Sequence, residues 1–138
     1  MKSISAILIL FSLLAAVSCG GGGKWAGEPY PATVTSVVYT SDPIHVGNPF
    51  VVTMRLEFSK SNQVFVGSQV TWDATSFTVT VSPLFRDSKS SSGGAPPEPL
   101  IKGEVLTFST DGTWTIRVES ASGVQTKQIT VVPAGSEL

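Results

Sequence analysis

Apolar and polar side chains alternate along most of the chain from Thr33 onward, and this period of two is what most limits the possible folds. It is clearest between Phe50 and Phe58. The apolar members are Phe50, Val52, Met54, Leu56 and Phe58, and the polar members between them are Thr53, Arg55 and Glu57. Strict alternation predicts a strand with one face in a hydrophobic core and the other in water.

The same pattern recurs in short segments separated by turn residues. Strands are expected over 33–40, 50–58, 64–72, 77–81, 105–108, 114–118 and 124–132, with a bulge at Gly67-Ser68 and a hairpin turn at Ser122-Gly123. Trp114, Ile116 and Val118 are expected to share the core of the 50–58 strand. No segment shows a helical period. The pattern predicts an all-β protein, an immunoglobulin-like antiparallel β-sandwich of about seven strands.

The last part of the chain also resembles a known family. It reads Asp111-Gly112-Thr113-Trp114-Thr115-Ile116-Arg117-Val118, followed by Ala121-Ser122-Gly123 and Ile129-Thr130-Val131-Val132. This is similar to the last hairpin of bacterial immunoglobulin-like domains and of domains of the polycystic-kidney-disease type (PKD-like). The resemblance implies that an aromatic residue closes one end of the sandwich, and Trp114 stands where tyrosine is usual. It implies a fold and says little of function, because such sandwiches have many roles.

The amino end has the anatomy of an export signal. Lys2 precedes an apolar run from Ile4 to Val17, which is shorter than the roughly 20 residues of a membrane span, and Cys19 follows at once. The segment resembles the bacterial lipoprotein signal, with Ala16 in place of the usual leucine. The resemblance implies that residues 1–18 are removed and that Cys19 carries lipid, including an acyl chain such as palmitate. An ordinary signal would leave Cys19 as a free thiol in an oxidising compartment.

Glycine and proline dominate the next segment, which contains Gly20-Gly21-Gly22-Gly23 and then Pro29 and Pro31. We therefore expect residues 19–32 to be the lipidated cysteine and a flexible tether, 33–133 to be the sandwich, and 134–138 to be a tail. By resemblance to well-studied lipoproteins, Gly20 after the anchor favours the outer over the inner membrane. The domain would face the periplasm or the cell surface.

Charge excludes some partners. The nine basic and ten acidic residues are scattered, so the basic stripe that a nucleic-acid-binding protein needs is missing. We expect membrane attachment through the lipid alone, and a monomeric domain.

Catalytic and metal-binding patterns are sparse. His45 is the single histidine, and the chain contains no G-x-S-x-G elbow, so we expect no enzyme activity and no cofactor. A copper carrier would have to use His45 and Met54, whereas soft metal sites bring several such ligands together. No metal site is expected, although a small periplasmic ligand or metal carrier stays open as an alternative.

The segment from Arg86 to Pro99 is rich in serine, glycine and proline. An unstructured connection of this length is either a flexible insertion or a working surface. As a binding loop it would use Arg86, Asp87, Lys89 and Glu98.

The sequence predicts a lipid-anchored, non-catalytic envelope protein whose domain is a protein or glycan interaction module or an accessory to envelope assembly.

Overall fold

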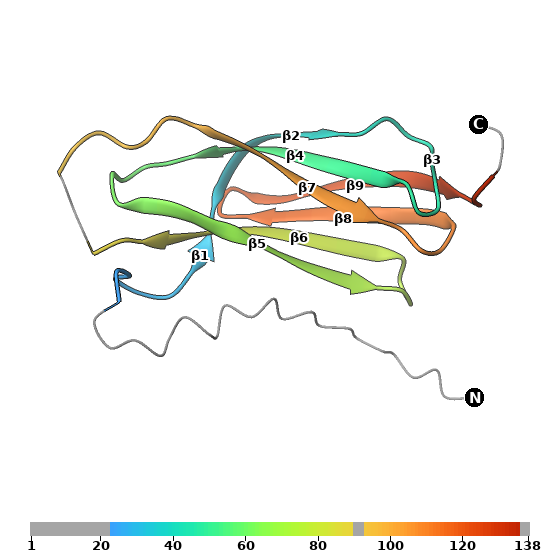
Figure 1. The fold of residues 1–138 in the computed structure, drawn as a ribbon, viewed down its shortest axis with the longest axis horizontal. Coiled ribbons are helices and arrows are strands. Elements are labelled where there is room, and N and C mark those ends of the chain that lie inside the picture. Colours follow the sequence, from blue (N-terminus) through green and yellow to red (C-terminus); the bar gives the residue numbers. More distant parts are fainter. Residues whose placement is uncertain (1–22, 90–92, 136–138) are drawn as a thin grey trace.

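A computed structural model describes residues 23–89 and 93–135, which form two β-sheets packed face to face (Figure 1). The strands are β1 (Tyr30–Pro31), β2 (Thr33–Tyr39), β3 (Ile44–His45), β4 (Pro49–Glu57), β5 (Gln63–Asp73), β6 (Thr78–Asp87), β7 (Leu100–Thr107), β8 (Gly112–Ser120) and β9 (Gly123–Val132). The predicted all-β sandwich is confirmed. In these two ranges no helix could cross a membrane.

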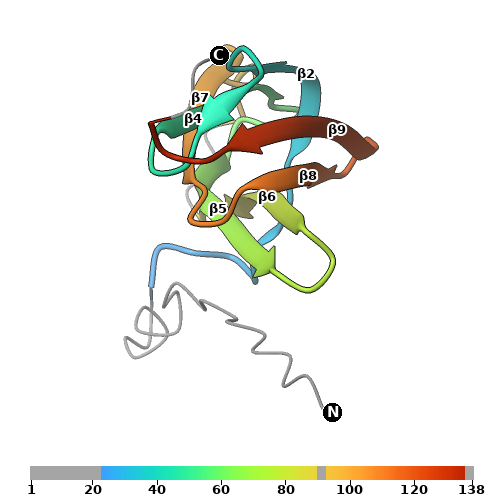
Figure 2. The ribbon, with the colours of Figure 1, turned by 90° about the vertical axis from the view of Figure 1, so that its right-hand side faces the viewer.

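The smaller sheet has the order β2-β4-β7, and all its pairs are antiparallel. In the larger sheet β6 pairs along one edge with β5 and along the other with β1 and β8; β9 and β3 follow. Figure 2 shows β5, β6, β8 and β9 side by side, with the smaller sheet of β2, β4 and β7 above them. Strands β5 and β7 therefore form the margins of the two sheets on one side of the sandwich.

Two pairings differ from the antiparallel expectation. Strand β6 runs parallel to β8, and β3 runs parallel to β9. The chain leaves β6, forms β7 in the other sheet, and returns to pair with β6 in the same direction as before. The prediction of a purely antiparallel sandwich is therefore wrong for these two pairs, because a crossover between sheets can bring a strand back in either direction.

The core lies between the two inner faces. The inward-facing apolar residues of β4 are completely buried, and those of β6 and β8 that face them across the sandwich are completely or almost completely buried. The fully or almost fully buried members are Phe50, Val52, Met54, Leu56, Val79, Val81, Trp114, Ile116 and Val118. The predicted shared core is confirmed except at Phe58, which follows β4, is half-buried and packs against the core. Alternation places every second residue of a strand on the inner face.

An aromatic cluster closes one end of the core. The Trp114 ring centroid lies 5.7 Å from that of Trp72, 5.1 Å from Phe77 and 5.2 Å from Phe108. Gly112 makes room for this cluster: a Cβ atom there would lie 3.0 Å from Cε1 of Phe77, and its φ of +134° also favours glycine.

Both turn predictions hold. The register of β5 on β6 shifts between Phe65 and Gly67, which is the expected bulge. Strands β8 and β9 form a hairpin in which Ser120 pairs with Gly123. Both features depend on residues that are close together in the sequence, and the structure has both where the sequence predicts them.

The expected tether over 19–32 is wrong for its second half. Trp25 forms an isolated β-bridge with Ser88, and β1 pairs with the end of β6. The Ala32 N–H donates to the Pro83 carbonyl at 2.9 Å, and Ala32 itself is fully buried. Pro29 precedes β1 and Pro31 is its second residue, paired with Leu84. Both prolines are tolerated because β1 is only two residues long and lies at a sheet margin.

The connection that follows β6 is shorter than expected. Strand β6 continues past Pro83 to Asp87, and β7 begins at Leu100, several residues before the predicted start at Val105. These residues gain hydrogen-bonded neighbours that the sequence does not reveal, β5 for the end of β6 and β4 for the start of β7. Long-range pairing therefore overrides the weak local preference for strand.

Candidate functional site

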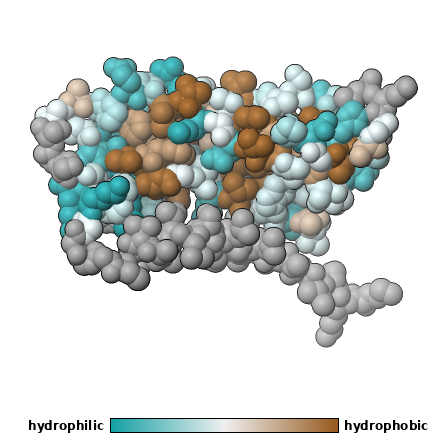
Figure 3. All heavy atoms as spheres, in the orientation of Figure 1, coloured by the Kyte–Doolittle hydropathy of each residue, from teal (hydrophilic) through white to brown (hydrophobic). Residues whose placement is uncertain are grey.

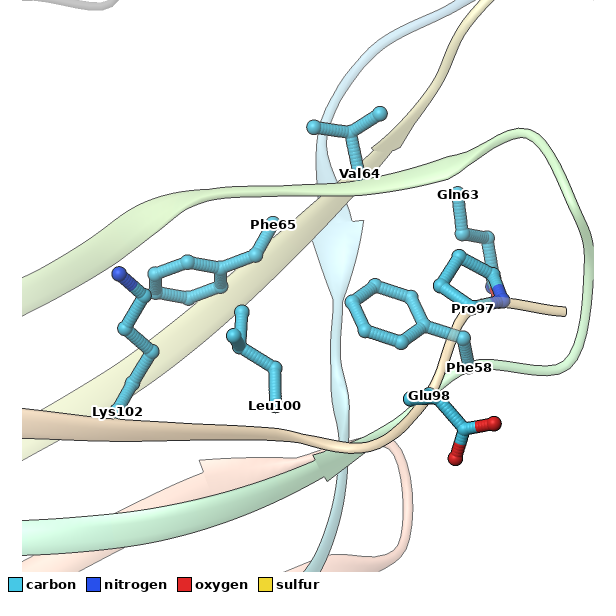
Figure 4. A pocket seen from close by; sticks show the side chains of 8 residues that line it. All are labelled: Phe58, Gln63, Val64, Phe65, Pro97, Glu98, Leu100 and Lys102. Carbon is cyan, nitrogen blue, oxygen red and sulfur yellow. The ribbon is translucent and has the colours of Figure 1, made fainter.

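A groove of about 370 Å³ opens at the sandwich margin where β5 faces β7 (Figure 4). Its volume is in the range of small-molecule and side-chain pockets. Its lining is mostly apolar and comes from the residue after β4, the start of β5, the segment before β7 and the start of β7: Phe58, Gln63, Val64, Phe65, Pro97, Glu98, Leu100 and Lys102.

Three half-buried apolar side chains form its floor. Phe58 lies flat on Phe85 in the core, with ring centroids 4.7 Å apart and planes inclined by 16°. Phe65 precedes the bulge in β5, and Leu100 opens β7; Figure 4 shows both side chains in the space between the two strands. Because Phe58 is stacked on a core ring, the floor is rigid on that side.

Two charged residues of opposite sign lie at the groove. The Nζ atom of Lys102 lies 5.8 Å from the centroid of the Phe65 ring, a cation–π distance. The carboxylate of Glu98 points away from the apolar floor in Figure 4. The groove can therefore accept an apolar group and contact polar atoms at its rim.

Gln63 fixes the turn that carries Phe58. Its side-chain oxygen accepts hydrogen bonds from the Ser59 N–H at 2.6 Å and the Lys60 N–H at 3.0 Å. Its amide nitrogen donates to the Tyr30 hydroxyl at 2.9 Å. Among the residues that the structure describes, Gln63 is the polar one that is buried, with 7% of its surface exposed. Its hydrogen bonds hold the β4–β5 turn against β1.

A polar network surrounds Asp87 beside the groove. Its carboxylate accepts hydrogen bonds from the Tyr30 hydroxyl and, at 2.8 Å, from the Lys60 ammonium group. The bond from Lys60, and then that from Tyr30, lower the pKa of Asp87 below its ordinary value. Burial, and next the bond to Asp87, raise the pKa of Tyr30. These groups therefore link β1, the β4–β5 turn and β6.

Asp87→Asn is expected to make stability less dependent on pH in the acid range. The folded-state pKa of Asp87 lies below its unfolded value of about 3.9. Its stabilising contribution is therefore present above about pH 4 and is lost as the pH falls through the lower folded-state pKa. Urea midpoints of wild type and variant between pH 2 and 7 measure this. A variant that loses stability as steeply as wild type below pH 4 would contradict the assignment.

A second contact group lies at the start of the described chain. The Trp25 ring has Nζ of Lys24 at 4.9 Å and the guanidinium carbon of Arg86 at 5.3 Å from its centroid. The Arg86 Nε atom also donates to the Gly27 carbonyl at 2.6 Å. Arg86 thus ties the N-terminal segment to β6.

The predicted binding-loop residues do not form one site. Arg86 and Asp87 belong to β6 and hold neighbouring segments, and the Lys89 N–H donates to the Lys24 carbonyl at 2.7 Å. Only Glu98 lines the groove. Cys19 lies outside the described residues.

Sequence reasoning missed the groove itself. Phe58 was expected in the core and Phe65 in an ordinary strand, and Leu100 lay outside the expected strands and the expected 86–99 loop. The alternating pattern marks apolar positions, but it does not show which of them lie at the open margin of a sheet.

The soft metal ligands considered from the sequence are separated by the fold. Met54 is completely buried in the core, whereas His45 lies in β3 and pairs with Val132. In residues 23–89 and 93–135, no three side chains of His, Cys, Asp or Glu come together as a candidate metal site.

No protein-family model matches the chain, and neither a curated protein nor a solved structure matches it.

Proposed function

We propose that this chain is a lipid-anchored, non-catalytic protein of the bacterial cell envelope whose sandwich binds a partner at the groove between β5 and β7. Anchoring comes from the lipoprotein-like signal ending at Cys19, and the outer membrane is the proposed location. The observation that carries the binding role is the groove, which has an apolar floor anchored on the core through Phe58 and charged groups at its rim.

A protein partner fits this groove better than a glycan. Sugars bind by lying on exposed aromatic faces, but one face of Phe58 is already stacked on Phe85. The ring of Phe65 has the Lys102 ammonium group 5.8 Å from its centroid, and Val64, Pro97 and Leu100 are aliphatic. Apolar side chains of a polypeptide can fill such a surface, and burying them supplies most of the free energy of association.

An immunoglobulin-like origin of the sandwich is part of this proposal. It is supported by the β8–β9 hairpin that begins at Gly112 and by the position of Trp114 in the aromatic cluster at one end. The parallel pairing of β6 with β8 is a departure from the antiparallel sheets of that family.

Photo-cross-linking in cells that make the protein tests the binding role. A benzoyl-phenylalanine at position 65 places the reactive ketone in the groove and keeps an aromatic side chain there. The matched control is the same residue at Val124, which is 51% exposed on β9, across the larger sheet from β5. We expect a discrete protein adduct from position 65 and none of that mass from position 124.

Two results would overturn the proposal. One is the same set of adducts from both positions, which would indicate random collisions. The other is no protein adduct from position 65 together with a small molecule or metal that copurifies with the chain, which would favour the carrier alternative.

A further inference from the structure

Strand β7 is an unusually open sheet edge. It pairs with β4 along one side, and among the described residues no strand pairs with its other side. It contains no proline, and its outward face exposes 58% of Ile101 and 61% of Val105. A long edge strand with exposed apolar side chains favours the addition of another strand.

The backbone shows which residues offer hydrogen bonds at this edge. The Val51 carbonyl accepts from Thr40 N–H, and the Val51 N–H donates to Thr40 Oγ1, so both backbone groups of Val51 point toward β2. The backbone N–H and C=O groups of its neighbour Val52 therefore point toward β7, where Val52 pairs with Glu104. Backbone groups alternate along a strand, so those of Ile101, Gly103 and Val105 point to the open edge.

We propose that a second copy of this chain pairs with β7 in antiparallel fashion, about a two-fold axis at Gly103, and so joins the two smaller sheets into one. This rests on the proposed function and deepens it, because it names the partner at the β5–β7 margin. It replaces the expectation of a monomeric domain. A two-fold contact uses the same surface of both copies, so the strand must be complementary to itself.

The sequence of β7 meets that condition in this register. Ile101 lies opposite the partner's Val105, so the two most exposed apolar side chains of the strand cover each other on the outward face. Lys102 lies opposite the partner's Glu104 on the other face, and opposite charges across strands are stabilising. The residues with free backbone groups also face one another, as a hydrogen-bonded ladder requires.

Neighbouring registers are disfavoured. A shift by two residues in one direction places Lys102 opposite the partner's Lys102, and in the other direction Glu104 opposite the partner's Glu104; like charges across strands are destabilising. A shift by one residue brings the outward face of one copy against the inward face of the other. Lys102 and Glu104 therefore select the register centred on Gly103.

The ends of the contact are also defined. Pro99 precedes β7 and has no N–H, so the added ladder stops there. Leu100 and Lys102 belong both to this edge and to the groove lining, so the second copy lies along the groove's rim.

Figure 3 shows the molecule in the orientation of Figure 1, where β7 lies toward the viewer. Hydrophobic residues form patches near the middle of this face.

Charge reversal in the full chain tests the pairing. Two differently tagged copies are made in the same cells and co-purified in mild detergent. Lys102→Glu or Glu104→Lys, present in both copies, sets like charges against each other and is expected to weaken association roughly tenfold or more. The double variant, with both reversals, restores opposite charges and is expected to regain most of the wild-type co-purification.

Cysteine cross-linking tests the geometry. A Lys102→Cys copy and a Glu104→Cys copy face each other at a pair without hydrogen bonds, where Cα atoms lie about 4.5 Å apart, a separation that a disulfide spans. We expect a disulfide-linked dimer from this mixture, much less from Lys102→Cys alone, and none from Val124→Cys. The unaltered chain reveals any contribution from Cys19.

Equal co-purification of wild type and both single variants would overturn the proposal, because a shared micelle or another surface would then explain association. So would absence of co-purification by wild type. If position 65 cross-links a different protein while copies of this chain do not associate, self-pairing is refuted and the groove's binding role stands. Folding of each variant is checked by its melting temperature.

Discussion

Trp114→Ala is expected to lower the free energy of unfolding by about 3–5 kcal/mol, the usual cost of removing a large aromatic side chain from a core. Trp114 is 3% exposed and contacts Trp72, Phe77 and Phe108. The cavity would lie at the end of the sandwich, where these rings come from separate strands and turns and so cannot collapse together. Urea unfolding followed by far-ultraviolet circular dichroism measures the change.

Two variants separate packing from other effects. Trp114→Phe keeps an aromatic ring but loses the hydrogen bond from Nε1 to the Thr110 carbonyl, 2.9 Å long, and should cost clearly less than Trp114→Ala. Thr113→Ala, at an exposed position on the same strand, should change stability by less than about 0.5 kcal/mol. Similar costs for Trp114→Ala and Thr113→Ala would contradict the role of this cluster.

Cys19→Ser is expected to abolish lipid attachment completely. The Cys19 thiol is the proposed attachment point of the lipid, and the serine of the variant has no thiol. Each buried methylene of the acyl chains contributes about 0.8 kcal/mol to membrane affinity, and the variant loses this contribution. Cells grown with an alkyne-labelled palmitate should label the wild-type protein and not the variant. Mass spectrometry should find wild type beginning at an acylated Cys19.

Ser18→Ala is the matched control, because it keeps a small residue before the cysteine and should keep the label. Label on Cys19→Ser, or an intact Met1 on the wild-type protein, would refute the anchor. Neither result would bear on the groove, which lies in a different part of the chain.

The local sequence was enough to predict those structural features that depend only on residues a few positions apart. The inner and outer faces of β4 follow from alternation, because successive side chains of any strand point to opposite sides. The Gly67 bulge and the hairpin after Ser120 also follow locally, because glycine permits backbone conformations that other residues resist. Burial of Trp114, Ile116 and Val118 was predictable for the same reason.

The candidate site was only partly predictable. Of the four residues expected in a binding loop, Glu98 lines the groove. Arg86 and Asp87 were expected in the same loop, but they belong to β6 and bind Gly27, Tyr30 and Lys60. Serine, glycine and proline nearby suggested mobility, but the partners of these two side chains come from segments far away in the sequence. A local pattern has no information about them.

The sequence by itself determined that this chain forms strands, which residues of β4 and β8 face the core, and where the β5 bulge and the β8–β9 turn fall. Only the tertiary structure decided that β6 runs parallel to β8, that the segment after Lys24 joins the sheet, and that β5 and β7 lie at an open margin with a groove between them. The physical reason is distance along the chain. Periodicity depends on neighbours within a strand, whereas sheet order and edges depend on which distant strands bury the most apolar surface together.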